Sequence, residues 1–153
     1  MNRRFLTVAF ASVLLASCGS PGDQTAFKAP QDWNSTPGIM GRFQMWMNNG
    51  QVVMLIRGDK NMTIQDAEKS SPSAGAMNFA KAQDIKLCGG SQPAQAFSGE
   101  ATSDVNGKKQ PKIMEATVTE IAGSKYMAIY VRPKSMAKGD PQAEAAIHSV
   151  CPK

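Results

Sequence analysis

The sequence holds few side chains that could do chemistry: three cysteines, one histidine and a cluster of methionines. Cysteine thiolates act as nucleophiles and metal ligands, whereas thiols in an oxidising compartment tend to pair. Cys88 and Cys151 form neither a C-x-x-C redox motif nor a zinc-ligand pattern. We therefore expect a structural disulfide between Cys88 and Cys151, which would close a loop of about 60 residues.

The third cysteine, Cys18, ends an N-terminal pattern. Two arginines precede an apolar run over residues 5–15, which suits a signal peptide and is too short to cross a bilayer as a helix. Residues 15–18 read Leu-Ala-Ser-Cys and resemble the lipobox of bacterial lipoproteins. The resemblance implies cleavage of residues 1–17 and lipidation of Cys18. The alternative is an ordinary signal peptide with a cysteine near its cleavage site.

The lipobox also implies a place in the cell and a division of the chain. Two or three acyl chains hold a protein stably on a membrane. Gly19, in place of an aspartate, resembles the signal for outer-membrane sorting, so we expect a lipid-anchored protein on the periplasmic face of the outer membrane. Residues 18–32 are small and polar, which predicts a flexible tether. One domain is expected over residues 33–153.

The methionines suggest a second chemistry. Met45 and Met47 would share one face of a strand, with Met40 and Met54 close in sequence. Thioethers select Cu(I), which makes periplasmic copper handling an alternative hypothesis. Methionine is also a flexible core filler, and Trp46 would point to the opposite face. We expect a core role, assign no metal or cofactor, and keep Met45 and Met47 as the copper candidates.

Catalytic residues are not evident. His148 lies at the end of the expected C-terminal helix, where a cation complements the helix dipole. Ser135 and Lys138 form an S-x-x-K triplet without the companion motifs of penicillin-binding enzymes. We assign no catalytic residue and expect a protein that is not an enzyme, with a small hydrolase as an alternative.

The composition excludes some classes of protein. Hydrophobic residues make up 42% and charged residues 19%, which is typical of a globular domain. The formal charge is +5, but the basic residues are spread along the chain, and the pair Lys108-Lys109 has no aromatic neighbour. Nucleic-acid binders gather basic charge and interleave it with aromatic residues, so we expect no nucleic-acid partner.

Hydrophobic periodicity predicts an antiparallel sheet. Asn49-Gly50 favours a tight hairpin turn, and the run over 126–132 is apolar on both faces, as in a central strand. Asp140 and Pro141 predict the start of a helix. The fold class expected is α+β, an antiparallel β-sheet with hairpins backed by a C-terminal helix and a short middle helix. The strands are expected over residues 39–47, 52–56, 85–88, 94–102, 113–121 and 126–132, and the middle helix over 64–69.

The order of these elements resembles that of PsbP-like domains over residues 33–151, from an entry that contains Trp33 to the closing helix. The resemblance implies a binding or assembly module without a shared catalytic site. We therefore expect an extracytoplasmic lipoprotein that acts as a binding or envelope-assembly module. Its partners would be the membrane, through the lipid anchor, and an envelope protein or ligand that the sequence does not identify.

Overall fold

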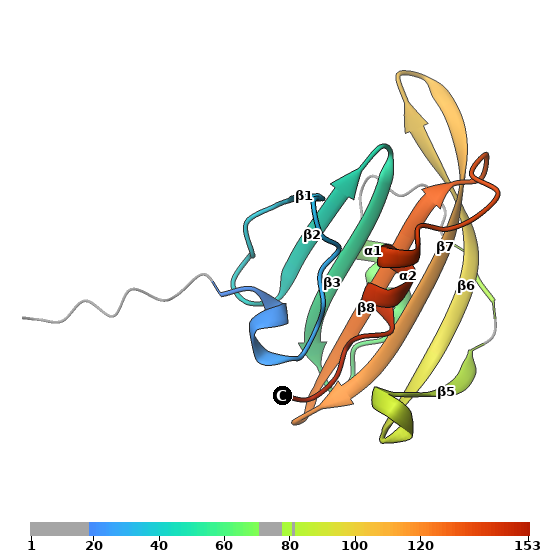
Figure 1. The fold of residues 1–153 in the computed structure, drawn as a ribbon. Coiled ribbons are helices and arrows are strands. Elements are labelled where there is room, and N and C mark those ends of the chain that lie inside the picture. The colour runs from blue at the N-terminus through green and yellow to red at the C-terminus, as the bar shows by residue number, and fades with distance from the viewer. Residues whose placement is uncertain (1–18, 71–77, 81) are drawn as a thin grey trace, which may run out of the picture.

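The computed structural model describes residues 19–70, 78–80 and 82–153. It consists of one antiparallel sheet with a helix on each side (Figure 1). The helices are α1 (Ile64–Ser70) and α2 (Pro141–Ile147), and the short 3-10 turns are η1 (Pro21–Gln24) and η2 (Cys88–Gly90). The strands are β1 (Asn34–Ser35), β2 (Phe43–Asn48), β3 (Gln51–Asp59), β4 (Asn78–Phe79), β5 (Gln83–Leu87), β6 (Gln92–Val105), β7 (Lys108–Ile121) and β8 (Ser124–Pro133).

Within the described residues, eight strands form the sheet in the order β1-β2-β3-β8-β7-β6-β4, and β5 also pairs with β6. Each pairing is antiparallel. The predicted fold class, an antiparallel sheet with a C-terminal helix and a short middle helix, is confirmed. The apolar strand β8 lies between β3 and β7, as its two apolar faces predict.

Among the described residues, three hairpins have two-residue turns with positive φ at both central residues, and two of these turns are Asn-Gly pairs. Asn49 and Gly50 have φ angles of 47° and 76°, and Asn106 and Gly107 have φ angles of 55° and 75°. Positive φ at both central residues fits the right-handed twist of the strands that a two-residue turn joins. The second of these turns ends the long β6–β7 hairpin. Because β8 stops opposite Lys112, the hairpin continues beyond the sheet as a two-stranded ribbon (Figure 1).

The sheet has a separate apolar core on each face. On the face covered by α2, here the α2 face, Tyr126, Ala128 and Tyr130 of β8 pack with Ala143 and Ile147 of the helix. On the opposite face, here the α1 face, the buried side chains form a second core below α1. The buried members of the α1-face core are Met54, Ile64, Ala67, Ala116, Val118, Met127 and Ile129. Half-buried apolar side chains surround the second core, so α1 covers its face incompletely.

A threonine directly precedes the helix α1. The amide and the hydroxyl of Thr63 both donate hydrogen bonds of 2.8 Å to Oδ2 of Asp66. These bonds, the backbone one first, lower the pKa of the Asp66 carboxyl because they favour its charged form. The α2 start also follows its sequence, since Asp140 caps the amides of Gln142 and Ala143.

The prediction of a flexible tether over residues 18–32 is wrong for residues 20–30, here the N-terminal strap. Pro21 and Thr25 are buried, and Thr25 forms a β-bridge with Pro152. The amide of Ala26 donates a 2.8 Å hydrogen bond to the carbonyl of Cys151. Both backbone groups and side chains hold the strap, since the partly buried Phe27 also packs against the α2-face core. Residues 1–18, with the signal-peptide boundary and Cys18, lie outside the described residues.

Several helices and strands also begin or end at residues other than those predicted. The strand expected over 39–47 begins only at Phe43, and Ile39 forms an isolated bridge to that residue. The last helix ends at Ile147, and Cys151 lies four residues beyond it. The short strand β4 is not among the predicted strands.

Candidate functional site

A groove of about 470 Å³ opens at one end of the sheet, where β5, β6, β7 and the start of β8 lie side by side. Its apolar floor includes Val118, a member of the α1-face core. The groove therefore continues this apolar face toward the sheet end. The lining residues are Asp84, Ile85, Lys86, Pro93, Ala94, Gln95, Val118, Thr119, Glu120 and Lys125.

Strand register explains why charged residues surround the apolar floor. Gln95 pairs with both Asp84 and Val118, and Glu120 pairs with Lys125. Residues that pair directly across an antiparallel ladder share a face of the sheet. Asp84, Glu120 and Lys125 therefore lie on the α1 face. Lys86 lies on the same face, because side chains two positions apart along β5 point to the same side of the sheet. The rim holds as many acidic as basic side chains.

The polar groups at the groove are already partly engaged. Thr119, the one hydroxyl residue of the lining, donates a 2.8 Å hydrogen bond to the Pro93 carbonyl and accepts one of 2.7 Å from Gln92 Nε2. A hydroxyl held in this way is not placed as a nucleophile. The groove can instead hold a ligand that combines an apolar body with charged or polar groups.

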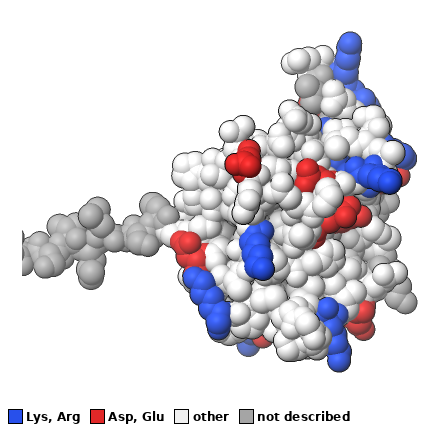
Figure 2. All heavy atoms as spheres, in the orientation of Figure 1, with Lys and Arg blue, Asp and Glu red and all other residues white. Residues whose placement is uncertain are grey.

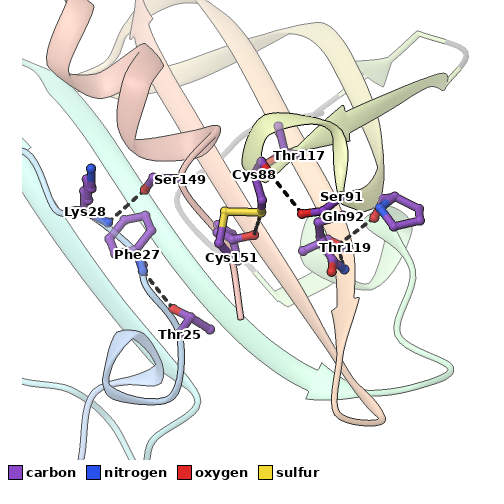
Figure 3. Close-up of a disulfide and its surroundings, with 12 residues drawn as sticks. Thr25, Phe27, Lys28, Cys88, Ser91, Gln92, Thr117, Thr119, Ser149 and Cys151 are labelled. Carbon is purple, nitrogen blue, oxygen red and sulfur yellow. Dashed lines mark hydrogen bonds between the residues drawn. A yellow bond between two sulfur atoms is a disulfide. The ribbon is translucent and has the colours of Figure 1, made fainter. Parts of the chain in front are cut away.

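The disulfide fixes one wall of this groove. Figure 3 shows Cys88 bonded to Cys151, with a Cα–Cα distance of 5.8 Å. Cys88 directly follows β5, which pairs with β6 alone in the part of the chain that the structure describes. The disulfide ties this edge of the sheet to the C-terminal tail, and the Ala26–Cys151 hydrogen bond ties the same tail to the N-terminal strap. The cysteine pair expected from the sequence therefore has a structural place beside the groove.

The methionine candidates occupy different environments. Met45 packs against the α1-face core and pairs with Met54 across the β2–β3 ladder. Met47 is 39% exposed and lies farther along the same strand. Trp46 points to the α2 face, where it is buried. Met45 thus has the surroundings of a core filler, and the sequence pattern placed Trp46 on the correct face.

The histidine and the acidic residues do not build a metal or catalytic cluster in the described part of the chain. Over residues 19–70, 78–80 and 82–153, no three His, Cys, Asp or Glu side chains come together in a way that could hold a metal ion. His148 is exposed at the C-cap of α2, where its Nδ1 lies 2.8 Å from the Glu144 carbonyl oxygen. This is the helix-end position expected from the sequence.

Surface charge is mixed on the side of the molecule that carries α2. Figure 2 shows Lys and Arg side chains gathered around the end of the β6–β7 hairpin, and single charges of both signs elsewhere. Lys108 and Lys109 directly follow the turn of this hairpin, at the start of β7. None of the helices in the described residues has the length and apolar character needed to cross a membrane.

Sequence patterns gave no sign of the groove. Its residues come from four separate stretches between Asp84 and Lys125, and the strand register brings them together. Each charged residue, taken alone, has the pattern of an ordinary solvent-facing strand position. The only relevant pattern was a charged residue two positions from an apolar residue on the same strand. Many surface strands share this pattern, so it does not identify a groove.

Comparisons with known proteins add little. No family model matches the sequence, and no curated protein matches it. One solved structure that is similar is "LpqN involved in cell envelope biogenesis of Mycobacterium tuberculosis". It shares 11% sequence identity with this chain at a TM-score of 0.40, over 80% of this chain and 78% of that chain. A likeness at this level carries no conclusion for this chain.

Proposed function

We propose that this chain is a lipid-anchored protein of the bacterial cell envelope that acts by binding a ligand or partner in the groove between β5 and β8. The anchor is supported by the lipobox-like residues 15–18 and the apolar run before them. The binding role is supported by one observation above all: the groove joins an apolar floor to a rim of both charges. An amphiphilic ligand or a mixed protein surface fits such a lining.

Binding suits the groove better than catalysis does. General acid–base and nucleophilic steps need a nucleophile or base held next to a partner that activates it. The lining offers Thr119, whose hydroxyl is engaged with Pro93 and Gln92. The carboxylate of Asp84 is engaged weakly, with Gln95 Nε2 at 3.4 Å from its Oδ1. These contacts position side chains and do not form a nucleophile–base pair.

The anchor is tested by intact-mass analysis of the full chain after membrane extraction, with and without reductant. We expect a mass that begins at Cys18 with acyl chains, and a gain of two hydrogens when the Cys88–Cys151 bond is reduced. A mass without acyl chains would remove the anchor from the proposal.

The groove is tested with a photoreactive amino acid at Gln95 in the full chain, in intact cell envelopes. The matched position is Ala145, which is exposed on the outer side of α2. We expect a discrete adduct from position 95 that is missing from position 145. The same adduct should weaken when Lys86→Glu and Lys125→Glu reverse the positive charges of the rim. Equal labelling from both positions would contradict the groove as the binding site.

A further inference from the structure

The first residues of the described chain pack tightly against the loop between β1 and β2. A Cβ atom built on Gly38 would lie 2.9 Å from Cα of Ser20 and 3.0 Å from the carbonyl oxygen of Gly19. A Cβ on Gly41 would lie 3.5 Å from the same oxygen. Glycine at position 38 is therefore required for the approach. The Ser20 hydroxyl also donates a hydrogen bond to Oε1 of Gln44, which fixes the strap beside this loop.

The two residues between these glycines carry the most exposed large apolar side chains among the described residues. Ile39 is 58% exposed and Met40 is 80% exposed, followed by Met47 at 39%. Scattered single apolar residues on a surface are ordinary, but here two lie next to one another at the tip of one loop. Arg42, which is also exposed, follows them.

The backbone conformation of Met40 is unusual for an apolar residue, and the stability of the fold does not explain why methionine occupies this position. Met40 has a φ angle of 50°, in the left-handed region that favours Gly, Asn and Asp. Its side chain is largely in solvent, so burial does not offset the unfavourable conformation. Outliers of this kind concentrate at functional sites. The position thus holds an apolar side chain where the turn itself would favour a polar residue.

The proposed lipidation site, Cys18, directly precedes Gly19, the residue that lies against the β1–β2 loop. Position 18 is one residue before Gly19, so its Cα lies about 3.8 Å from that of Gly19. The strap begins at once after it, with Pro21 buried and Thr25 bridged to Pro152. An acyl anchor on Cys18 would therefore enter the membrane next to Ile39 and Met40, without a long spacer. Figure 1 shows the start of the described chain beside the β1–β2 loop.

We propose that Ile39 and Met40 insert into the bilayer surface beside the lipid anchor, so that the domain sits on the membrane in one orientation. The occupant of this apolar loop is the lipid bilayer that holds the anchor. Apolar side chains flanked by a basic residue are typical of segments that lie in the membrane interface, where Arg42 can meet lipid phosphates. This inference rests on the proposed lipidation of Cys18.

The test uses the full chain after export and membrane extraction, with its acylation checked by intact mass. The protein is reconstituted into vesicles of phosphatidylethanolamine and phosphatidylglycerol, and its methionines are footprinted with hydroxyl radicals. Exposure in the structure alone predicts faster oxidation of Met40 than of Met47. Insertion of the loop predicts the reverse order, with oxidation of Met40 several-fold slower than that of Met47.

A variant that retains the fold but lacks the apolar side chain provides a second test of the insertion. Met40→Asn suits the positive φ angle, so the fold should be retained while the apolar side chain is lost. In vesicles we expect amide exchange over residues 38–42 to rise several-fold in Met40→Asn, and to stay unchanged in the matched variant Met47→Asn.

The outcomes separate this inference from the anchor itself. Acylated protein in which Met40 still oxidises faster than Met47 would overturn the insertion and leave the anchor standing. Protein without acyl chains would overturn both. Protection of Met40 that rises with the protein-to-lipid ratio would assign the loop to a second copy of the chain, and would also overturn insertion into the bilayer.

Discussion

The phenol of Tyr130, on β8, accepts a 2.9 Å hydrogen bond from the backbone amide of Asp140, the N-cap residue of α2. The same phenol donates a hydrogen bond to Oε1 of Gln51 on β3. Tyr130 is fully buried and Gln51 nearly so. A single hydroxyl thus joins two central strands to the start of the helix that covers the α2 face.

The first prediction removes this hydroxyl. Tyr130→Phe leaves the Gln51 oxygen and the Asp140 amide without their partner in a dry environment, which costs about 1–3 kcal/mol. We expect the free energy of unfolding, measured by urea denaturation, to fall by that amount. Tyr126→Phe is the matched control, because its hydroxyl makes only a 3.5 Å contact with Gln24. Equal losses in the two variants would contradict a special role for Tyr130.

The second prediction concerns alkaline pH. Burial, the largest cause, raises the pKa of the Tyr130 phenol above its usual value of 10.0. The contribution of the neutral phenol to the free energy of unfolding is fully present below the pKa that tyrosine has in the unfolded chain. It is lost as pH rises through the raised pKa of the folded protein. Between about pH 9 and about pH 11 we expect wild-type protein to lose more stability than Tyr130→Phe. Parallel pH curves for the two proteins would show that this phenol ionises equally in both states.

Local chemistry was enough to predict the parts of the fold that depend on neighbouring residues. The turn at Asn49-Gly50 needs only two residues that accept positive φ, and both are present. The α2 start needs only Asp140 and the proline after it. The N-terminal strap was missed because its backbone hydrogen-bonds to residues more than 100 positions away, as from Lys28 to Ser149. Composition does not report contacts of that kind, and the groove was missed for the same reason.

The third prediction tests whether the strap belongs to the fold. The Phe27 ring packs on Trp46 with ring centroids 5.1 Å apart. Phe27 is half-buried, so we expect Phe27→Ala to cost about 1–3 kcal/mol of unfolding free energy, below the cost at a fully buried site. The neighbouring exposed position serves as a control: Lys28→Ala keeps the backbone bond to Ser149 and should cost less than about 0.5 kcal/mol. A free tether would make both substitutions neutral.

The fourth prediction concerns the disulfide. Cys88 and Cys151 are 63 residues apart, which corresponds to about 4 kcal/mol of stability in the chain-entropy model. We expect the paired variant Cys88→Ser, Cys151→Ser to lose about that much free energy of unfolding. The disulfide lies directly after β5. In the paired variant, amide exchange should therefore rise more in Gln83–Leu87 than in the central strand β3. Uniform acceleration across the sheet would contradict a local role beside the groove.

The last prediction separates the core role of the methionines from copper handling. Met45 packs against the α1-face core, whereas Met47 is more exposed. Met45→Ala should therefore cost about 2 kcal/mol and Met47→Ala less than about 0.5 kcal/mol. The double variant Met45→Leu, Met47→Leu conserves volume, so it should stay within about 1.5 kcal/mol of wild type.

Copper binding is then measured on proteins of matched stability, by native mass spectrometry during Cu(I) titration. Thioether ligands are lost in the leucine variant but its packing is kept, so only metal binding distinguishes it from wild type. We expect the two proteins to take up Cu(I) equally. One Cu(I) per wild-type chain that the leucine variant fails to bind would instead establish Met45 and Met47 as ligands, because the packing of Met45 would be conserved.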